Sequence, residues 1–246
     1  MTPQLLLNIR KEVINLLFNR YVFRTHQEIV RFNPRLQDRP RNIFSRWARV
    51  VYVGATVAGV RRLASASYQD GDVSLVKLLD TLIHEPRQLW DSFARHYAAD
   101  AAKARDGVLK EAGQLLVGWE ISACKRLLCE DRKMAINVTE KVNWFASKRV
   151  AHSVPDKVVS TTFSDLDTAI DVLKLLTEKY TLLAQVEKLD LLEEMKSRGL
   201  PNGWDSIFLE PWATPEIIAR PLGEMPPPKR AASGGPRGPA VSRQSG

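Results

Sequence analysis

The sequence predicts an all-α fold, and three observations support that prediction. Apolar residues recur at spacings of three and four over most of the chain before its proline-rich end, which is the period of helices that bury one face. Residues typical of helix starts, such as Thr2 followed by Pro3, precede these stretches. No segment shows the alternating pattern of a half-buried strand between turn signals. We therefore expect a bundle of about five to seven helices.

The first helix is expected from Pro3 to about Phe32 and the second from Ile43 to about Ala64, with two X-Pro pairs in the loop between them. Glycine lowers the intrinsic propensity of a soluble helix, by up to about 1 kcal/mol, and small side chains let two helices approach, so a group of small residues suggests a close helix crossing. The second helix contains four of them, Gly54, Ala55, Ala58 and Gly59. We expect this helix to be central.

The next two helices are expected in the middle of the chain. Either Asp72 or Ser74 can cap a short helix that continues through Leu82. A longer helical pattern of apolar residues then starts at Pro86 and continues to Trp119. We expect this second segment to be the long arm of the bundle.

Two further helices are predicted after that arm. Residues 137–140 resemble a helix start, and the helix that they open is expected to stop at Pro155. Ser164 with Asp167 three residues later is a variant capping box, followed by a clear apolar stripe to Leu183. This last helix has the strongest pattern in the chain.

Proline and glycine divide the chain into a folded part and a tail. Nine of 14 prolines and seven of 13 glycines lie from Gly199 onward. We expect residues 1–198 to form the bundle, 199–222 to be a partly ordered extension with aromatic residues that can dock on the core, and 223–246 to be disordered.

Composition and cysteine content indicate a cytoplasmic protein with reduced thiols. The longest apolar run, Val50–Val60, is far shorter than the ~20 residues that a spanning helix needs. No basic region precedes the first apolar residues, so no signal peptide is expected. Cys124 and Cys129 lie on different faces of an expected helix and are predicted to pack as thiols, with metal or redox chemistry as the alternative.

Positive charge is concentrated near the N-terminus. The formal net charge is +8, and residues 1–50 contain ten Lys and Arg against three Asp and Glu. Such an excess attracts phosphate backbones through counterion release, although a solvated helix face or an ion-pair surface between subunits has the same composition. The candidate nucleic-acid contacts are Arg31, Arg35, Arg39, Arg41 and Arg46.

The common signatures of nucleotide, zinc and hydrolase sites do not occur, so no cofactor or metal site is expected. The segment 146–153, Ala-Ser-Lys-Arg-Val-Ala-His-Ser, has basic residues before Ala-His and a small polar residue after it. With segments 60–63, 72–79 and 162–180, it resembles the HEPN superfamily in its AbiU-like abortive-infection branch. The resemblance covers roughly residues 20 to 195.

The resemblance implies a compact helical bundle, usually a homodimer, whose active members cut RNA without a metal. Their signature is an arginine, four to six intervening residues and a histidine. The histidine moves a proton during attack by the ribose 2′-hydroxyl, and the arginine stabilises charge on the phosphate. Here the catalytic candidates are His152 with Arg149 or Lys148.

The signature is incomplete at this histidine. The three positions at the allowed spacings from His152 are Phe145, Ala146 and Ser147, and none is a cation. Lys148 and Arg149 are closer than the motif allows, and they also suit a helix C-terminus, where the dipole favours positive charge. One formal match, Arg20 with His26, is expected by chance in a chain this rich in arginine.

Three functions fit these observations. The first is a HEPN-like protein of microbial defence or toxin–antitoxin type, dimeric and RNA-associated, with a degenerate ribonuclease motif and an antitoxin protein as partner. The second is an active metal-independent endoribonuclease toxin that uses His152. The third is a non-catalytic module whose helices and basic segment bind only other protein chains.

Overall fold

The described part of the chain consists of helices and short connecting segments and contains no strand, which confirms the predicted all-α bundle. The computed structural model describes residues 3–32, 43–65, 72–89, 91–92, 95, 121–146, 161–185 and 187–197. The helices are α1 (Pro3–Phe32), α3 (Ile43–Ala64), α4 (Leu75–His84), α7 (Ile121–Phe145), α8 (Phe163–Gln185) and α9 (Leu191–Ser197).

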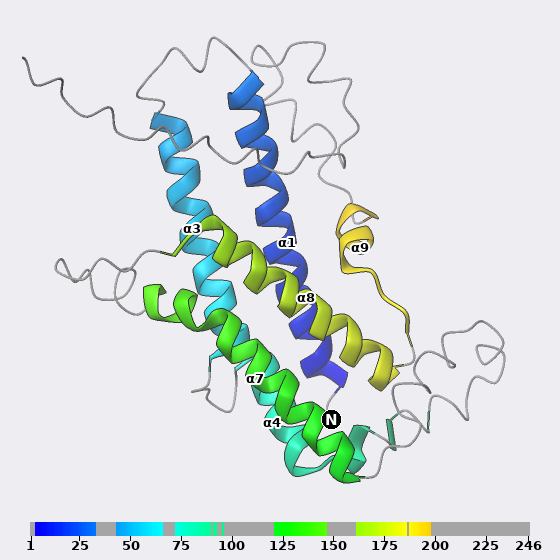
Figure 1. The fold of residues 1–246 in the computed structure, drawn as a ribbon. Helices are drawn as coiled ribbons and strands as arrows, with labels where there is room; N and C mark the ends of the chain where they lie inside the picture. The colour runs from blue at the N-terminus through cyan, green and yellow to red at the C-terminus, as the bar shows by residue number, and fades with distance from the viewer. Residues whose placement is uncertain are drawn as a thin grey trace, which may run out of the picture.

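Helices α1 and α3 form a long antiparallel hairpin, and both have the bounds that the sequence predicts. Helices α7 and α8, also antiparallel to each other, pack across the lower half of this hairpin (Figure 1). Helix α4 lies against α7, and α9 lies beside α1. The far ends of α1 and α3 extend past α8, so the described helices form a bundle with a projecting hairpin end.

The core lies where the helices overlap. Each of α1, α3, α4, α7 and α8 contributes a stripe of side chains that are almost inaccessible to solvent, and burial of such side chains is the main stabilising term of the fold. The largest fully buried side chains are Tyr180, Leu6, Ile9, Leu16, Leu17, Leu63, Leu75, Leu78, Leu79, Leu82, Leu89 and Leu128.

A buried polar cluster joins α7 to α8. The Asp131 side chain is deeply buried, and its Oδ2 accepts hydrogen bonds from Lys179 Nζ at 2.6 Å and from the Tyr180 hydroxyl at 2.7 Å. Burial, together with the nearby Asp131 carboxylate, raises the pKa of Tyr180 well above its ordinary value. The cluster therefore compensates a buried charge that would otherwise be costly.

Ser74, one of the two predicted caps, caps α4. The backbone N–H of Lys77 donates to Ser74 Oγ at 3.3 Å, and the Ser74 hydroxyl donates to the Leu63 carbonyl at 3.1 Å. The helix ends at His84, slightly beyond the predicted Leu82. Ser74 therefore satisfies the start of one helix and the end of another, since Leu63 lies in the last turn of α3.

The predicted helix start at residues 137–140 is wrong, because α7 begins at Ile121 and continues through this segment. Thr139 is fully buried in the helix interior, and its hydroxyl donates to the Ala135 carbonyl one turn earlier at 2.7 Å. The buried stripe that includes Leu128, Ala135 and Val142 is continuous across this segment. Packing therefore overrides a local pattern that favours a helix start.

The capping box of α8 lies two residues before the predicted one. The Thr162 hydroxyl accepts from the Asp165 backbone N–H at 3.1 Å, and Asp165 Oδ2 accepts from the Thr162 backbone N–H at 2.8 Å. The Thr162 backbone N–H and the Thr162 hydroxyl, which donates to the same Oδ2 at 2.7 Å, lower the pKa of the Asp165 carboxyl. The two residues of the predicted capping box, Ser164 and Asp167, make other contacts. Asp167 pairs with Arg24, and the Ser164 carbonyl accepts a hydrogen bond from the Thr168 hydroxyl.

The close helix crossing predicted from small residues occurs at one glycine of α3. A Cβ on Gly59 would lie 2.7 Å from Leu16 Cδ2 of α1, whereas a Cβ on Gly54 would meet nothing within 4 Å. Ala55 and Ala58 are exposed. Helix α3 is therefore central only in its second half, where Gly59 allows α1 to approach.

Other predictions are confirmed in part or lie outside the described residues. Cys124 is buried and Cys129 half-buried; both are free thiols, and burial raises the pKa of Cys124. The arm predicted from 86 to 119 lies mostly outside the described residues, as does the tail from 199 to 246. Within the described part, no helix combines the length and the apolar character needed to cross a membrane.

Candidate nucleic-acid interface

The structure describes some of the predicted site residues but not others. Lys148, Arg149 and His152 lie outside the described residues, as do Arg35, Arg39 and Arg41. Arg31 and Arg46 are described, and they lie near the same end of the hairpin, at the last turn of α1 and the first turn of α3.

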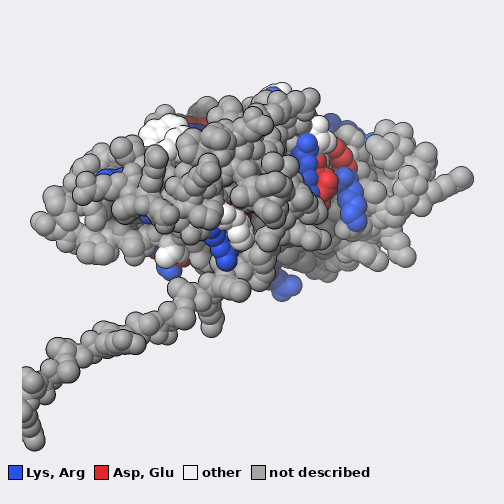
Figure 2. All heavy atoms as spheres, turned by 90° about the horizontal axis from the view of Figure 1, so that it is seen from above, with Lys and Arg blue, Asp and Glu red and all other residues white. Residues whose placement is uncertain are grey.

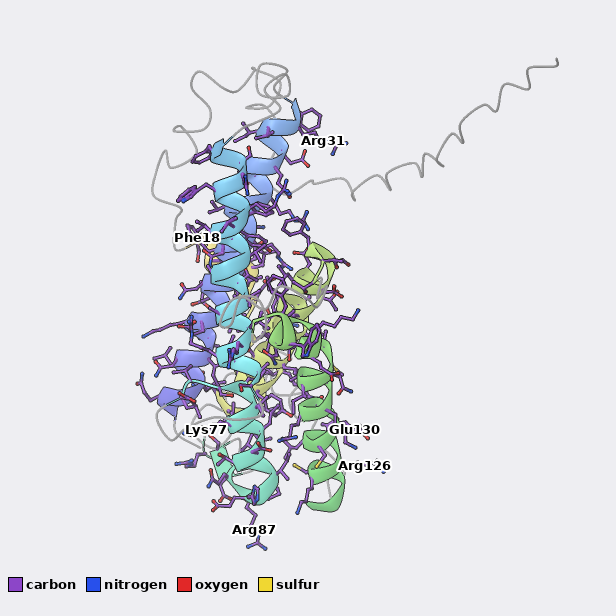
Figure 3. All side chains as sticks on the ribbon, turned by 90° about the vertical axis from the view of Figure 1, so that its left-hand side faces the viewer. Phe18, Arg31, Lys77, Arg87, Arg126 and Glu130 are labelled. Atoms are coloured by element: carbon purple, nitrogen blue, oxygen red, sulfur yellow. The ribbon has the colours of Figure 1, made fainter. Side chains whose placement is uncertain are left out.

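Arg31 is a partly exposed cation at the end of α1. Its side chain is 47% exposed, its Nη1 lies 3.6 Å from Glu28 Oε1, and its guanidinium carbon lies 5.3 Å from the centroid of the Phe32 ring. An exposed ion pair of this kind contributes at most about 1 kcal/mol and is screened by salt. A phosphate can therefore compete for this guanidinium. Figure 3 shows Arg31 at the opposite end of the molecule from Arg87, Arg126 and Glu130.

The first half of α3 exposes large apolar side chains and arginines together. We call this the tip surface, and it consists of Phe44, Arg46, Trp47, Arg49, Val50 and Val51, all of which are exposed. Among the described residues, Arg46 and Arg49 have no ion-pair partner. The surface therefore presents positive charge and accessible rings to a common partner.

The register of α3 explains this exposure. The helix turns its inner face toward α1 at Tyr52, and the Tyr52 ring stacks on Phe23 with centroids 4.2 Å apart. One and two turns earlier, the same face carries Ala48 and Ser45, which are only half-buried. Trp47, Val50 and Val51 lie off this inner face, whereas Phe44 contacts His26 of α1 and is still partly exposed. In the sequence, Phe44, Trp47, Val50 and Val51 mark the apolar period of the helix, but the structure leaves them exposed to solvent.

A series of rings leads from the interior to Trp47. His26 of α1 is buried, its Nε2 lies 3.2 Å from Ser45 Oγ, and its ring meets Phe44 edge-on at 5.2 Å between centroids. Phe44 in turn lies 5.6 Å from Trp47. Burial lowers the pKa of His26, so the imidazole is neutral at pH 7. Positive charge at the tip surface therefore comes from its arginines.

Much of the basic excess in residues 1–50 is neutralised within the chain. Arg24 pairs with Asp167 of α8, Arg20 Nη1 lies 2.7 Å from Asp171 Oδ1, and Arg10 Nε lies 2.7 Å from Glu194 Oε2 of α9. Figure 2, which looks down on the molecule, shows the visible basic side chains of the described residues in separate places. At one of these places, acidic side chains lie between the basic ones. The charge that remains available in the described part of this segment lies mainly near the tip surface.

The Arg20–His26 match to the ribonuclease signature is not a site. Arg20 extends from α1 toward Asp171 of α8, whereas His26 contacts Ser45 of α3. The two side chains therefore face different helices, in agreement with their interpretation as a chance match.

Two of the three positions at which the signature of His152 requires an arginine belong to the core. Ala146, at the end of α7, is only 3% exposed, and Phe145 packs against the core cluster. A guanidinium at the position of Ala146 would lose its hydration there. The apolar residues thus fit the packing at the end of α7.

The sequence contained a signal for Trp47 and Arg49 that the list of basic candidates missed. Aromatic and basic residues interleave at 44, 46, 47 and 49, and α3 contains four arginines and no acidic residue.

Among the described residues, no group of three or more His, Cys, Asp or Glu side chains is arranged to hold a metal. Comparison with protein-family models, curated proteins and solved structures finds no match to this chain.

Proposed function

We propose that this chain is a HEPN-like, RNA-associated protein of microbial defence or toxin–antitoxin type that holds RNA at the tip surface. The observation that supports this most is the pairing of exposed arginines with exposed rings on a helix that has no acidic residue. Arginines that face solvent can neutralise phosphates, and exposed rings can stack on bases. Arg31 lies near the same end of the hairpin and adds to this charge.

The proposal includes binding without cleavage. Two of the three positions of the missing arginine are occupied by apolar residues of the packing at the end of α7, Ala146 in the core and Phe145 against it, which supports the interpretation of the ribonuclease motif as degenerate. His152, with Arg149 or Lys148, remains the prediction for a ribonuclease alternative and lies outside the described residues. From the resemblance alone we also propose a homodimer with an antitoxin protein as partner, and we keep the cytoplasmic location as a proposal from composition and cysteine content.

The salt dependence of RNA binding tests the proposal. For single strands, the slope of log K against log salt decreases by about 0.7 for each phosphate contact that is lost. We expect Arg46→Gln together with Arg49→Gln to reduce the slope by about 1.4 and to weaken binding at low salt. Arg126→Gln is the matched control, because Arg126 is an exposed arginine near the opposite end of the molecule (Figure 3).

The binding should be measured with the full chain and a labelled single-stranded RNA at several salt concentrations. The recovered RNA should be full-length, as binding without cleavage requires. The proposal fails if the wild-type chain does not bind RNA, or if Arg126→Gln changes the slope as much as the double variant does.

A further inference from the structure

We infer that the tip surface binds unpaired bases of single-stranded RNA and that Trp47 is the residue on which a base stacks. This inference rests on the proposed function and specifies the form of RNA that the site takes. It depends on the exposure and support of one indole ring, on the charge around it, and on the access that each form of RNA gives to its bases.

Trp47 offers a supported ring face to solvent. Its side chain is 57% exposed, and the Phe44 ring lies 5.6 Å from it. Phe44 is itself held edge-on by the buried His26 ring at 5.2 Å. An indole supported in this way loses little conformational freedom when a base stacks on it. The geometry is that of a preformed stacking platform.

The charge around Trp47 selects an anionic occupant. Arg46 and Arg49 flank it in the sequence, and α3 has no acidic residue to offset them. A second copy of this surface would bring arginines against arginines, which is unfavourable in an interface. A polyanion that also carries flat apolar rings satisfies both the guanidinium groups and the indole.

Unpaired RNA has this chemistry, whereas duplex RNA keeps its bases stacked on each other. The major groove of an A-form helix is too deep and narrow for side chains, and its shallow groove presents edges and hydroxyls rather than base faces. Stacking on an aromatic side chain therefore requires a base that is not in a duplex. The tip surface accordingly favours a single strand over a duplex of equal charge.

The test compares Trp47→Ala and Trp47→Phe with a matched tryptophan on another helix. Trp144 lies on α7, away from the tip surface, and is 43% exposed. The basic residue near it, Lys141, pairs with Asp165. Trp144→Ala therefore removes an exposed indole from another surface. Each full-length variant is titrated with a short unpaired RNA and with a hairpin-capped duplex at two salt concentrations. Thermal unfolding checks that the variants remain folded.

We expect Trp47→Ala to weaken binding to the single strand by about ten-fold with an unchanged salt slope, because stacking and charge act separately. Trp47→Phe should retain most of the affinity, and Trp144→Ala should bind as the wild type does. The three tryptophan variants should bind the duplex as the wild type does.

The inference is overturned if Trp47→Ala binds the single strand as tightly as the wild type while the Arg46→Gln and Arg49→Gln variant loses affinity. In that case the proposed function survives without the stacking site. It is also overturned if Trp47→Ala changes only the oligomeric state in light scattering, since the indole would then cover a second copy. A wild-type chain that binds no RNA refutes both.

Discussion

Individual residues resolve two points that the sequence left ambiguous. Asp131 carries a formal charge in a stretch of mixed polar and apolar residues, and the sequence alone does not show whether it faces solvent. The structure buries it to 4% exposure and gives it a cation and a phenol hydroxyl from α8. Conversely, Trp47 is an apolar residue that faces solvent. Side-chain type alone predicts neither location.

Substitutions at Asp131 should separate its charge from its hydrogen bonding. Asp131→Ala leaves the Lys179 ammonium without a counterion and the Tyr180 hydroxyl without an acceptor. We expect the free energy of unfolding to fall by about 3 kcal/mol. Asp131→Asn retains an acceptor oxygen and should cost less. Chemical denaturation of both variants measures the difference, and equal losses, or a loss under about 1 kcal/mol for alanine, would show that the cluster does not stabilise the fold.

At the scale of elements, helix bounds were predicted best where an apolar stripe and an end signal coincide. The bounds of α1 and α3 were correct, and Ser74 was one of two candidates for the cap that it forms. The errors arose where several residues could serve as a cap. Residues 137–140 contain typical starting residues but lie inside α7, because a helix can satisfy a threonine hydroxyl with its own carbonyls.

The corrected start of α8 has a direct consequence for stability. Thr162→Ala removes the hydroxyl that accepts from Asp165 N and should cost about 1 kcal/mol of unfolding free energy. Ser164→Ala, the matched change at the cap that the sequence suggested, should cost almost nothing, because Ser164 lies on the exposed side of the first turn. Denaturant titrations of the two variants check this, and a larger loss for Ser164→Ala would return the cap to the predicted position.

At the scale of the whole molecule, the sequence predicts the class of fold but not how its surface is divided. The basic excess of residues 1–50 is a sequence fact, yet its distribution depends on contacts made more than a hundred residues away, such as those of Arg20 and Arg24 with α8. These ion pairs leave the tip surface as the candidate site. No local pattern shows that the first half of α3 projects beyond α8, because that projection depends on how the helices are assembled (Figure 1).

Ultraviolet cross-linking of the full chain to a short single-stranded RNA, followed by mass spectrometry of the peptides, tests the central claim most directly. The account predicts that the main cross-linked peptide contains Phe44 and Trp47, and that Trp47→Ala reduces this cross-link while Trp144→Ala leaves it unchanged. Cross-links found mainly on α7, α8 or α9, with none in residues 43–51, would contradict it.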